Sequence, residues 1–101
     1  MGTTSMRPSI VFEQHRETIR RIVAAHRASH PRVFGSVLLG TDADDSDLDL
    51  LVEPTAETSL LDIARIQVEL ESQLGIPIDV LTPKALPSTF RDRILNEARP
   101  V

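Results

Sequence analysis

The sequence has no cysteine, no tryptophan and no tyrosine, and its only aromatic residues are three phenylalanines. Without cysteine, disulfide bonds and thiolate metal sites are excluded. With so few aromatic rings, the chain lacks the stacking platforms that single-stranded nucleic-acid binders use. Long apolar runs are also missing, because no stretch approaches the roughly 20 residues that a membrane-spanning helix requires. We therefore expect a soluble protein of the cytoplasm.

An excess of positive charge is missing too. Eleven lysines and arginines stand against fifteen aspartates and glutamates, which gives a net charge of -4 at pH 7. The chain as a whole therefore lacks the excess of positive charge that attracts nucleic acid. Any phosphate chemistry must rely on a metal ion or on local arginines. The length of 101 residues predicts a single domain, 1–101, with a modest core, and about the first eight residues are expected to be disordered.

Apolar residues recur at helical and strand spacings and predict a mixed α/β domain with a small sheet of about three strands flanked by helices. The strand over 47–52 is apolar on one face and partly apolar on the other, which predicts an interior position in the sheet. The link to the next strand is long enough for a helical crossover, so these two strands can pair in parallel. The expected helices span residues 9–28, 36–39, 59–74 and 88–98, and the expected strands span residues 32–34, 47–52 and 76–81.

An acidic stretch with five aspartates in eight residues stands just before and inside the second strand. A solvated acidic loop is the usual meaning of such a run, and it accounts for Asp42, Asp44 and Asp45. It does not account for Asp49, which lies between two leucines of an apolar strand. An ionised carboxylate buried without a partner costs several kcal/mol or takes up a proton.

Two kinds of cation site compete for this stretch. A calcium loop starting at Asp42 fits poorly, because its sixth position requires glycine and carries Asp47, and its second half resembles a strand. A magnesium site fits better, since Mg²⁺ prefers one or two carboxylates together with substrate phosphates and water. Asp47 and Asp49 are two residues apart at the start of a strand and therefore share a face.

Three further residues favour phosphoryl or nucleotidyl transfer at this magnesium site. Gly35 and Ser36 offer a phosphate an approach without a side chain, a hydroxyl group and the backbone amides of a helix start. Asp79 is the one acid inside the third strand. If that strand lies beside the second, Asp79 joins the site as a general base or as a ligand of a second metal ion.

Gly35-Ser36, followed after ten residues by Asp47-Leu48-Asp49, resembles the signature of the polymerase-β-like nucleotidyltransferases. The nearest resemblance is to the minimal nucleotidyltransferases, the MNT-domain antitoxins found beside HEPN toxins, and it covers nearly the whole chain. It implies the mixed α/β fold of that superfamily, with Mg²⁺ held by Asp47, Asp49 and Asp79. These three would also be the catalytic carboxylates, and Gly35 and Ser36 would contact the nucleotide phosphates.

The resemblance also implies a reaction and a partner. The chain would be a protein adenylyltransferase that moves AMP from ATP to a tyrosine hydroxyl of a HEPN RNase toxin and so acts as its antitoxin. A second hypothesis is an antitoxin with a weak or inactive site that neutralises its HEPN partner by binding. Transfer to a small molecule, as in antibiotic-modifying relatives, is a third hypothesis, and the lack of an accessory domain argues against it.

One position departs from the family pattern. Members commonly continue Gly-Ser-x-Ala-Arg-Gly after the turn, and this chain has Leu39 in place of the arginine. That arginine would bind the triphosphate and stabilise the leaving pyrophosphate, and loss of one such group can lower the rate on the order of 10²-fold. Arg32, Arg91 or Arg93, or an arginine of the partner, are the candidates to replace it.

Overall fold

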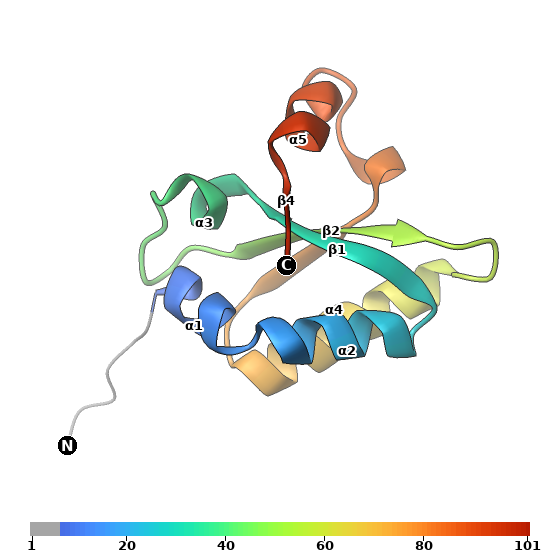
Figure 1. The fold of residues 1–101 in the computed structure, drawn as a ribbon, viewed down its shortest axis with the longest axis horizontal. Helices are drawn as coiled ribbons and strands as arrows, with labels where there is room; N and C mark the ends of the chain where they lie inside the picture. Colours follow the sequence, from blue (N-terminus) through green and yellow to red (C-terminus); the bar gives the residue numbers. More distant parts are fainter. Residues whose placement is uncertain (1–6) are drawn as a thin grey trace.

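The computed structural model describes residues 7–101 and has the predicted mixed α/β fold (Figure 1). The sheet contains four strands in the order β3-β2-β1-β4, where three were expected. The missed strand has two residues, one of them proline, and so carries no periodic pattern. The elements are α1 (Pro8–Gln14), α2 (Arg16–Ala25), β1 (Ala28–Phe34), α3 (Gly35–Leu39), β2 (Leu48–Pro54), α4 (Leu60–Leu74), β3 (Ile78–Leu81), the 3-10 helix η1 (Pro83–Ala85), α5 (Arg91–Glu97) and β4 (Arg99–Pro100).

Strand β2 lies inside the sheet, as its apolar pattern predicted. It pairs in parallel with β3 and antiparallel with β1, and β1 pairs antiparallel with β4. The parallel pair is joined by helix α4, which confirms the helical crossover. Since both edges of β2 are hydrogen-bonded, the residues of this strand are held on both sides.

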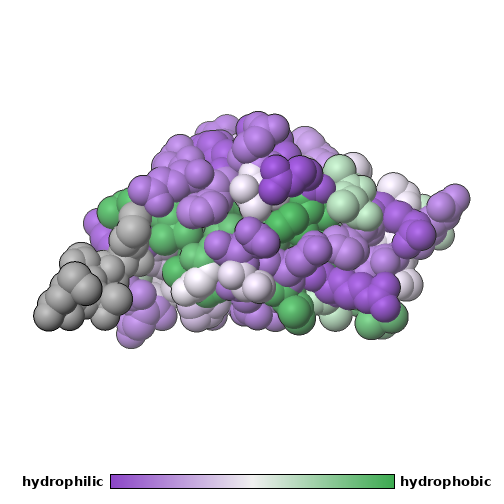
Figure 2. All heavy atoms as spheres, turned by 90° about the horizontal axis from the view of Figure 1, so that it is seen from below, coloured by the Kyte–Doolittle hydropathy of each residue, from purple (hydrophilic) through white to green (hydrophobic). Residues whose placement is uncertain are grey.

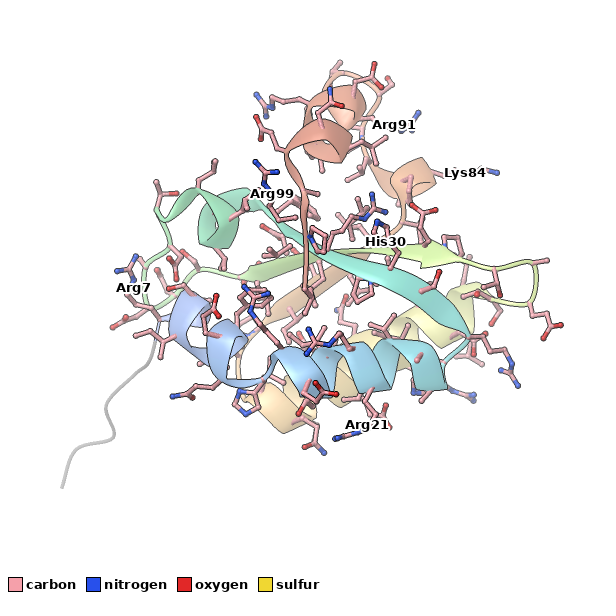
Figure 3. The ribbon with its side chains drawn as sticks, in the orientation of Figure 1. Arg7, Arg21, His30, Lys84, Arg91 and Arg99 are labelled. Atoms are coloured by element: carbon pink, nitrogen blue, oxygen red, sulfur yellow. The ribbon has the colours of Figure 1, made fainter. Side chains whose placement is uncertain are left out.

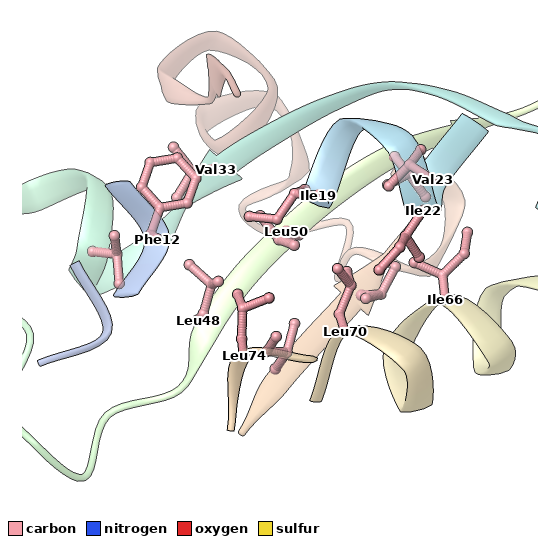
Figure 4. Close-up of a cluster of buried hydrophobic side chains, with 14 of the residues drawn as sticks. Phe12, Ile19, Ile22, Val23, Val33, Leu48, Leu50, Ile66, Leu70 and Leu74 are labelled. Carbon is pink, nitrogen blue, oxygen red and sulfur yellow. The ribbon is translucent and has the colours of Figure 1, made fainter. Parts of the chain in front are cut away.

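The two faces of the sheet are covered unequally. Helices α1, α2 and α4 pack against one face, where side chains such as Leu48 and Leu50 of β2 meet Ile66 and Leu70 of α4 (Figure 4). A smaller cluster on the other face joins β1 and β2 to η1 and α5, the upper part of Figure 1. Its buried members are Phe34, Leu51, Leu86 and Ile94. The polar side chains near the start of β2 lie on this second face, because they alternate along the strand with Leu48 and Leu50 of the first face.

The outer surface of the helical layer is mixed in character. Figure 2 shows apolar patches among polar side chains on the side seen from below in Figure 1. The exposed apolar side chains of α4 are Leu60, Leu61 and Val68. No helix of residues 7–101 is long and apolar enough to cross a membrane.

The N-terminal helix differs from the expectation in two ways. The expected helix over 9–28 is two helices, α1 and α2, separated at His15, whose backbone leaves the helical region with φ -125° and ψ 21°. The expected disorder is wrong for residues 7 and 8, because Pro8 is buried and occupies the first position of α1, where its missing amide costs nothing. Residues 1–6 lie outside the described part of the chain.

Strand β1 starts earlier than expected because a bulge admits the proline. The register shifts between Ser29 and Arg32, and His30 within this bulge has a positive φ of 52°. A bulge frees a backbone position from the ladder, so Pro31 can stand inside the strand without an amide.

The start of α4 lies where the sequence predicts a helix, and it is held by a capping box. The Asp62 amide donates to the Ser59 hydroxyl over 3.2 Å, and the Ser59 amide donates to the Asp62 carboxylate over 2.9 Å. Gly75 ends the helix in the left-handed region with φ 72°. This reciprocal cap satisfies two amides that a helix start leaves without partners.

Asp42 is not part of a solvated loop, contrary to the expectation. Its side chain is fully buried. One carboxylate oxygen accepts a hydrogen bond of 3.0 Å from the Arg7 guanidinium, and the other accepts one of 2.8 Å from the Ser9 amide at the start of α1. Figure 3 shows Arg7 beside the loop that joins α3 to β2. The calcium loop fits less well still, because the side chain of its first ligand is fully buried and both of its oxygens already accept hydrogen bonds from the protein.

We predict that Asp42→Asn lowers the free energy of unfolding by about 1–3 kcal/mol, because it breaks buried, charge-assisted hydrogen bonds. Burial alone would raise the pKa of Asp42, but the Ser9 hydrogen bond and the Arg7 charge hold it below its usual value. The contribution of Asp42 is therefore present above about pH 4 and is lost as the pH falls below that value. Urea titrations at pH 7 and pH 3 measure it. Asp44→Asn, an exposed neighbour, is the matched control and should change stability by less than about 0.5 kcal/mol.

Candidate active site

The turn from β1 into α3 brings Gly35 directly against Asp49. The two strands pair so that Phe34 stands opposite Asp49, one residue before the glycine. A Cβ atom added to Gly35 would lie 2.2 Å from the Oδ2 atom of Asp49, and Gly35 has a φ of +75°. Only glycine satisfies both conditions, since other residues rarely adopt this φ and any side chain would collide with the carboxylate. The predicted turn and the predicted acid are thus parts of one contact.

The third carboxylate reaches the same place across the sheet. Asp49 of β2 stands opposite Asp79 of β3 in the parallel register. Asp49 is partly buried, whereas Asp79 and Asp47, which lies just before β2, are exposed. The pairing supplies the adjacency of the second and third strands on which the role of Asp79 depends.

The electrostatics of the site fit a cation. Burial of Asp49, followed by the charge of Asp79 and then that of Asp47, raises the pKa of the Asp49 carboxyl from 3.8 to about 6. No ion pair reaches Asp49 within residues 7–101. An arrangement that crowds like charges without a protein cation favours the approach of a positive ion.

A complete all-protein metal cage is not formed. In the part of the chain described, no three aspartate, glutamate or histidine side chains converge as ready-made metal ligands. Mg²⁺ normally needs only one or two carboxylates, with substrate phosphates and water as its other ligands. Asp47 and Asp49 fit that requirement, with substrate phosphates and water left to complete the coordination.

The sequence offered three arginines to replace the one missing at Leu39, and two are engaged elsewhere. Arg32 is only 9% exposed and is paired with Glu53. Arg91 donates to three backbone carbonyl groups of the segment that includes η1. Arg93 lies over a phenylalanine ring, with 5.9 Å between the guanidinium carbon and the ring centroid. Leu39 itself is 63% exposed, so solvent reaches the position that would hold a cation.

A groove between α2 and α4 lies on the helical layer, which is on the other side of the sheet from Asp49. It has a volume of about 380 Å³. Its lining residues are His26, Leu61, Ala64, Arg65, Val68 and Glu69. It is therefore separate from the carboxylates.

Comparison with known proteins gives a consistent result. A family model described as "Nucleotidyltransferase domain" matches residues 13–101. A predicted protein adenylyltransferase of Methanocaldococcus jannaschii is 42% identical over 77 residues, which cover 76% of this chain and 83% of the relative. The protein adenylyltransferase MntA of Thermococcus cleftensis is 32% identical over 89 residues, covering 80% of this chain and 90% of the relative.

Solved structures agree with these relatives. The structure of a predicted minimal nucleotidyltransferase is 38% identical, with a TM-score of 0.85, and the match covers 97% of this chain and 100% of that one. A complex of the tri-AMPylated Shewanella oneidensis HEPN toxin with its MNT antitoxin matches with a TM-score of 0.65, 12% identity and coverage of 87% and 69%. At that identity the second likeness shows the fold alone.

The contact between Gly35 and Asp49 predicts a large effect of one methyl group. We expect Gly35→Ala to lower the free energy of unfolding by about 2–4 kcal/mol, because left-handed backbone strain and overpacking add. Gly40→Ala is the matched control, since Gly40 has the same φ of +74° but nothing within 4 Å of the added Cβ. It should cost only the strain, about 1–2 kcal/mol. Equal losses in urea titrations would contradict the contact.

The raised pKa of Asp49 predicts a pH-dependent effect of Asp49→Asn. The folded chain holds the Asp49 proton more tightly than the unfolded chain does, so wild-type stability falls as the pH rises from about 4 to about 6. With chelator present, Asp49→Asn should therefore be more stable than wild type by about 1–2 kcal/mol at pH 8, since one pKa unit is about 1.4 kcal/mol and exposure reduces the effect. The gain should vanish near pH 4.

The measurement is a urea titration of both proteins at pH 4, 6 and 8. Asp45→Asn, an exposed aspartate of the preceding loop, is the control and should show no such pH trend. A gain of the same size at pH 4 and pH 8 would mean that charge at Asp49 is not the cause.

Proposed function

The chain belongs to the nucleotidyltransferase domain family, and we propose that it transfers AMP from ATP to a hydroxyl group of a partner protein. The observation that carries this proposal is the contact of Asp49 with Gly35, with Asp79 in register across the sheet. It joins a place for phosphate to a group of carboxylates. Relatives at 42% and 32% identity that are named protein adenylyltransferases support the choice of a protein acceptor.

The roles follow from position and charge. Asp47 and Asp49 would hold Mg²⁺, which when bound offsets the negative charge of the triphosphate and helps to orient it. Gly35 and Ser36, at the start of α3, would bind the phosphates through backbone amides and the serine hydroxyl. Asp79 is exposed and stands opposite Asp49 in the sheet, and it would accept the proton of an incoming hydroxyl group or serve as a further metal ligand.

The proposed reaction balances as a single in-line displacement. The acceptor oxygen forms a bond to the α-phosphorus of ATP, while the bond from that phosphorus to the oxygen that bridges to the β-phosphate breaks. Pyrophosphate leaves with the electron pair, and the acceptor proton passes to Asp79 and then to water. The product is an AMP ester of the partner protein.

The acceptor we propose is a tyrosine of a HEPN-domain toxin, so that the chain acts as the antitoxin. A related fold occurs in the complex of an AMPylated HEPN toxin with an MNT antitoxin. Asp47 and Asp79 are both exposed, so a side chain presented by another protein can approach them. With ATP as the donor, the proposed place of this activity is the cytoplasm.

A second candidate function rests on the exposed Leu39. Without a cation at that position the transfer step would be slow, and the chain would neutralise its partner mainly by binding. The two candidates differ in whether neutralisation needs the carboxylates.

We predict that the purified chain, with Mg²⁺ and α-labelled ATP, labels a HEPN-domain protein encoded beside it in the same genome. Asp47→Asn or Asp49→Asn should lower the rate of labelling by about 10²-fold or more, since each removes charge stabilisation from the reacting phosphate. Asp44→Asn, which lies in the same acidic loop, is the control and should label at the wild-type rate.

The same variants separate the two candidate functions in cells. If Asp49→Asn no longer relieves growth arrest by the partner, transfer is required. If it relieves arrest as well as wild type does, binding alone is sufficient. Absence of label on the partner with the wild-type chain would contradict the transferase proposal.

A further inference from the structure

Asp79 is the carboxylate of the proposed site whose backbone has the least support from the sheet. It belongs to β3, which has four residues and forms one edge of the sheet. Asp49, by contrast, lies on β2, which pairs with a strand on each side. The outer side of an edge strand carries backbone amides and carbonyl groups that no neighbouring strand binds. The outer side of β3 therefore needs other partners if Asp79 is to stay in register with Asp49.

Two side chains of α4 bind this outer side of β3. The Ile78 amide donates a hydrogen bond of 3.1 Å to the Oε2 atom of Glu71. The Val80 amide donates one of 3.2 Å to the Oε1 atom of Gln67. Ile78 and Val80 are the residues directly before and directly after Asp79. The backbone that carries Asp79 is therefore held by β2 on one side and by α4 on the other.

The spacing of the two acceptors matches the spacing of the two amides. Gln67 and Glu71 are four residues apart and so lie on one side of α4, separated by a rise of about 6 Å along the helix. Ile78 and Val80 are two residues apart, which is about 6.6 Å along a strand. One turn of the helix thus spans the two amides. Both acceptor side chains are half-buried, which limits the access of competing water.

We infer that Gln67 and Glu71 are positioning residues for Asp79, because they fix the backbone of β3 on both sides of that carboxylate. This inference rests on the proposed function. Whether Asp79 accepts a proton or binds a metal ion, its role depends on placement, since a misplacement of about 1 Å can lower a rate on the order of 10²-fold. Neither side chain needs to touch the substrate, because each acts through the backbone of β3.

A shield for the sheet edge is the competing explanation of these contacts. Edge strands are commonly covered so that a strand of another chain cannot pair with them. A shield alone predicts that loss of an acceptor causes the chain to self-associate and leaves the transfer step of the monomer unchanged. A positioning role predicts a slower transfer step in the monomer. Experiments on the monomer therefore distinguish the two explanations.

The first experiment measures amide hydrogen exchange by NMR on the full-length chain without nucleotide. Gln67→Met keeps the length of the side chain but removes the acceptor, so it should speed exchange of the Val80 amide about tenfold. Glu71→Met should do the same for the Ile78 amide. Gln67→Glu and Glu71→Gln keep an acceptor oxygen and should retain most of the protection. Gln73→Met, at an exposed position of the same helix, is the matched control and should change neither amide.

The second experiment measures kcat and KM for labelling of the HEPN partner with Mg²⁺ and α-labelled ATP. Gln67→Met and Glu71→Met should each lower kcat about tenfold or more and leave the KM for ATP near the wild-type value, because the phosphate-binding turn is not moved. Gln67→Glu and Glu71→Gln should restore most of kcat, and Gln73→Met should match wild type. The midpoint of urea unfolding and the sedimentation of each variant show whether it is folded and monomeric.

The outcomes separate this inference from the proposed function. If wild type labels the partner and the two variants without an acceptor have the wild-type kcat, the inference fails and the transferase proposal stands. If those variants self-associate while their monomers keep the wild-type kcat, Gln67 and Glu71 only shield the edge. If kcat falls only as far as the folded fraction falls, their role is structural and the inference also fails. If the wild-type chain transfers no label, both the inference and the proposed function fail.

Discussion

The close approach of the Asp49 carboxylate to the backbone of Gly35 is the constraint on which the proposed site depends. It requires glycine at the turn, because no Cβ fits there. It also requires β1 and β2 to pair in one register, since a shift by one residue would turn Asp49 to the opposite face. The hydrophobic side chains that alternate with it, Leu48 and Leu50, are fully buried beneath the helices. The apolar core therefore fixes the position of a charged group that is costly to place.

The sequence predicted this site because its local chemistry conflicts with its surroundings. A carboxylate in an apolar strand has few explanations other than function, and the paired acids and the glycine turn narrowed them further. The capping box at Ser59 and the interior position of β2 were also predictable, since both rest on short-range rules of spacing. The proximity of Asp79 depended on strand order, which a single sequence indicates only through the length of the crossover.

Features that depend on contacts between distant segments were not predictable in this way. Asp42 resembles its solvated neighbours in sequence, and only the packing of α1 gives it the buried partners Arg7 and Ser9. Strand β4 has only two residues, Arg99 and Pro100, and is too short to have a periodic pattern. The break at His15 likewise leaves no signal, because apolar residues continue at helical spacing on both sides of it.

Asp42 has a further consequence for where a divalent cation settles. Besides the proposed ligand Asp47, the loop before β2 contains three aspartates, and such a cluster could hold the ion away from the nucleotide. Because Asp42 turns both of its oxygens toward the protein, only Asp44 and Asp45 remain available in the loop, and both are exposed to competing water. The fold thus reduces the ability of the loop aspartates to hold a cation, and it keeps their negative charge near the proposed site. In the proposed site, a divalent cation drawn to this end of the sheet would have one preferred place to remain, beside Asp49.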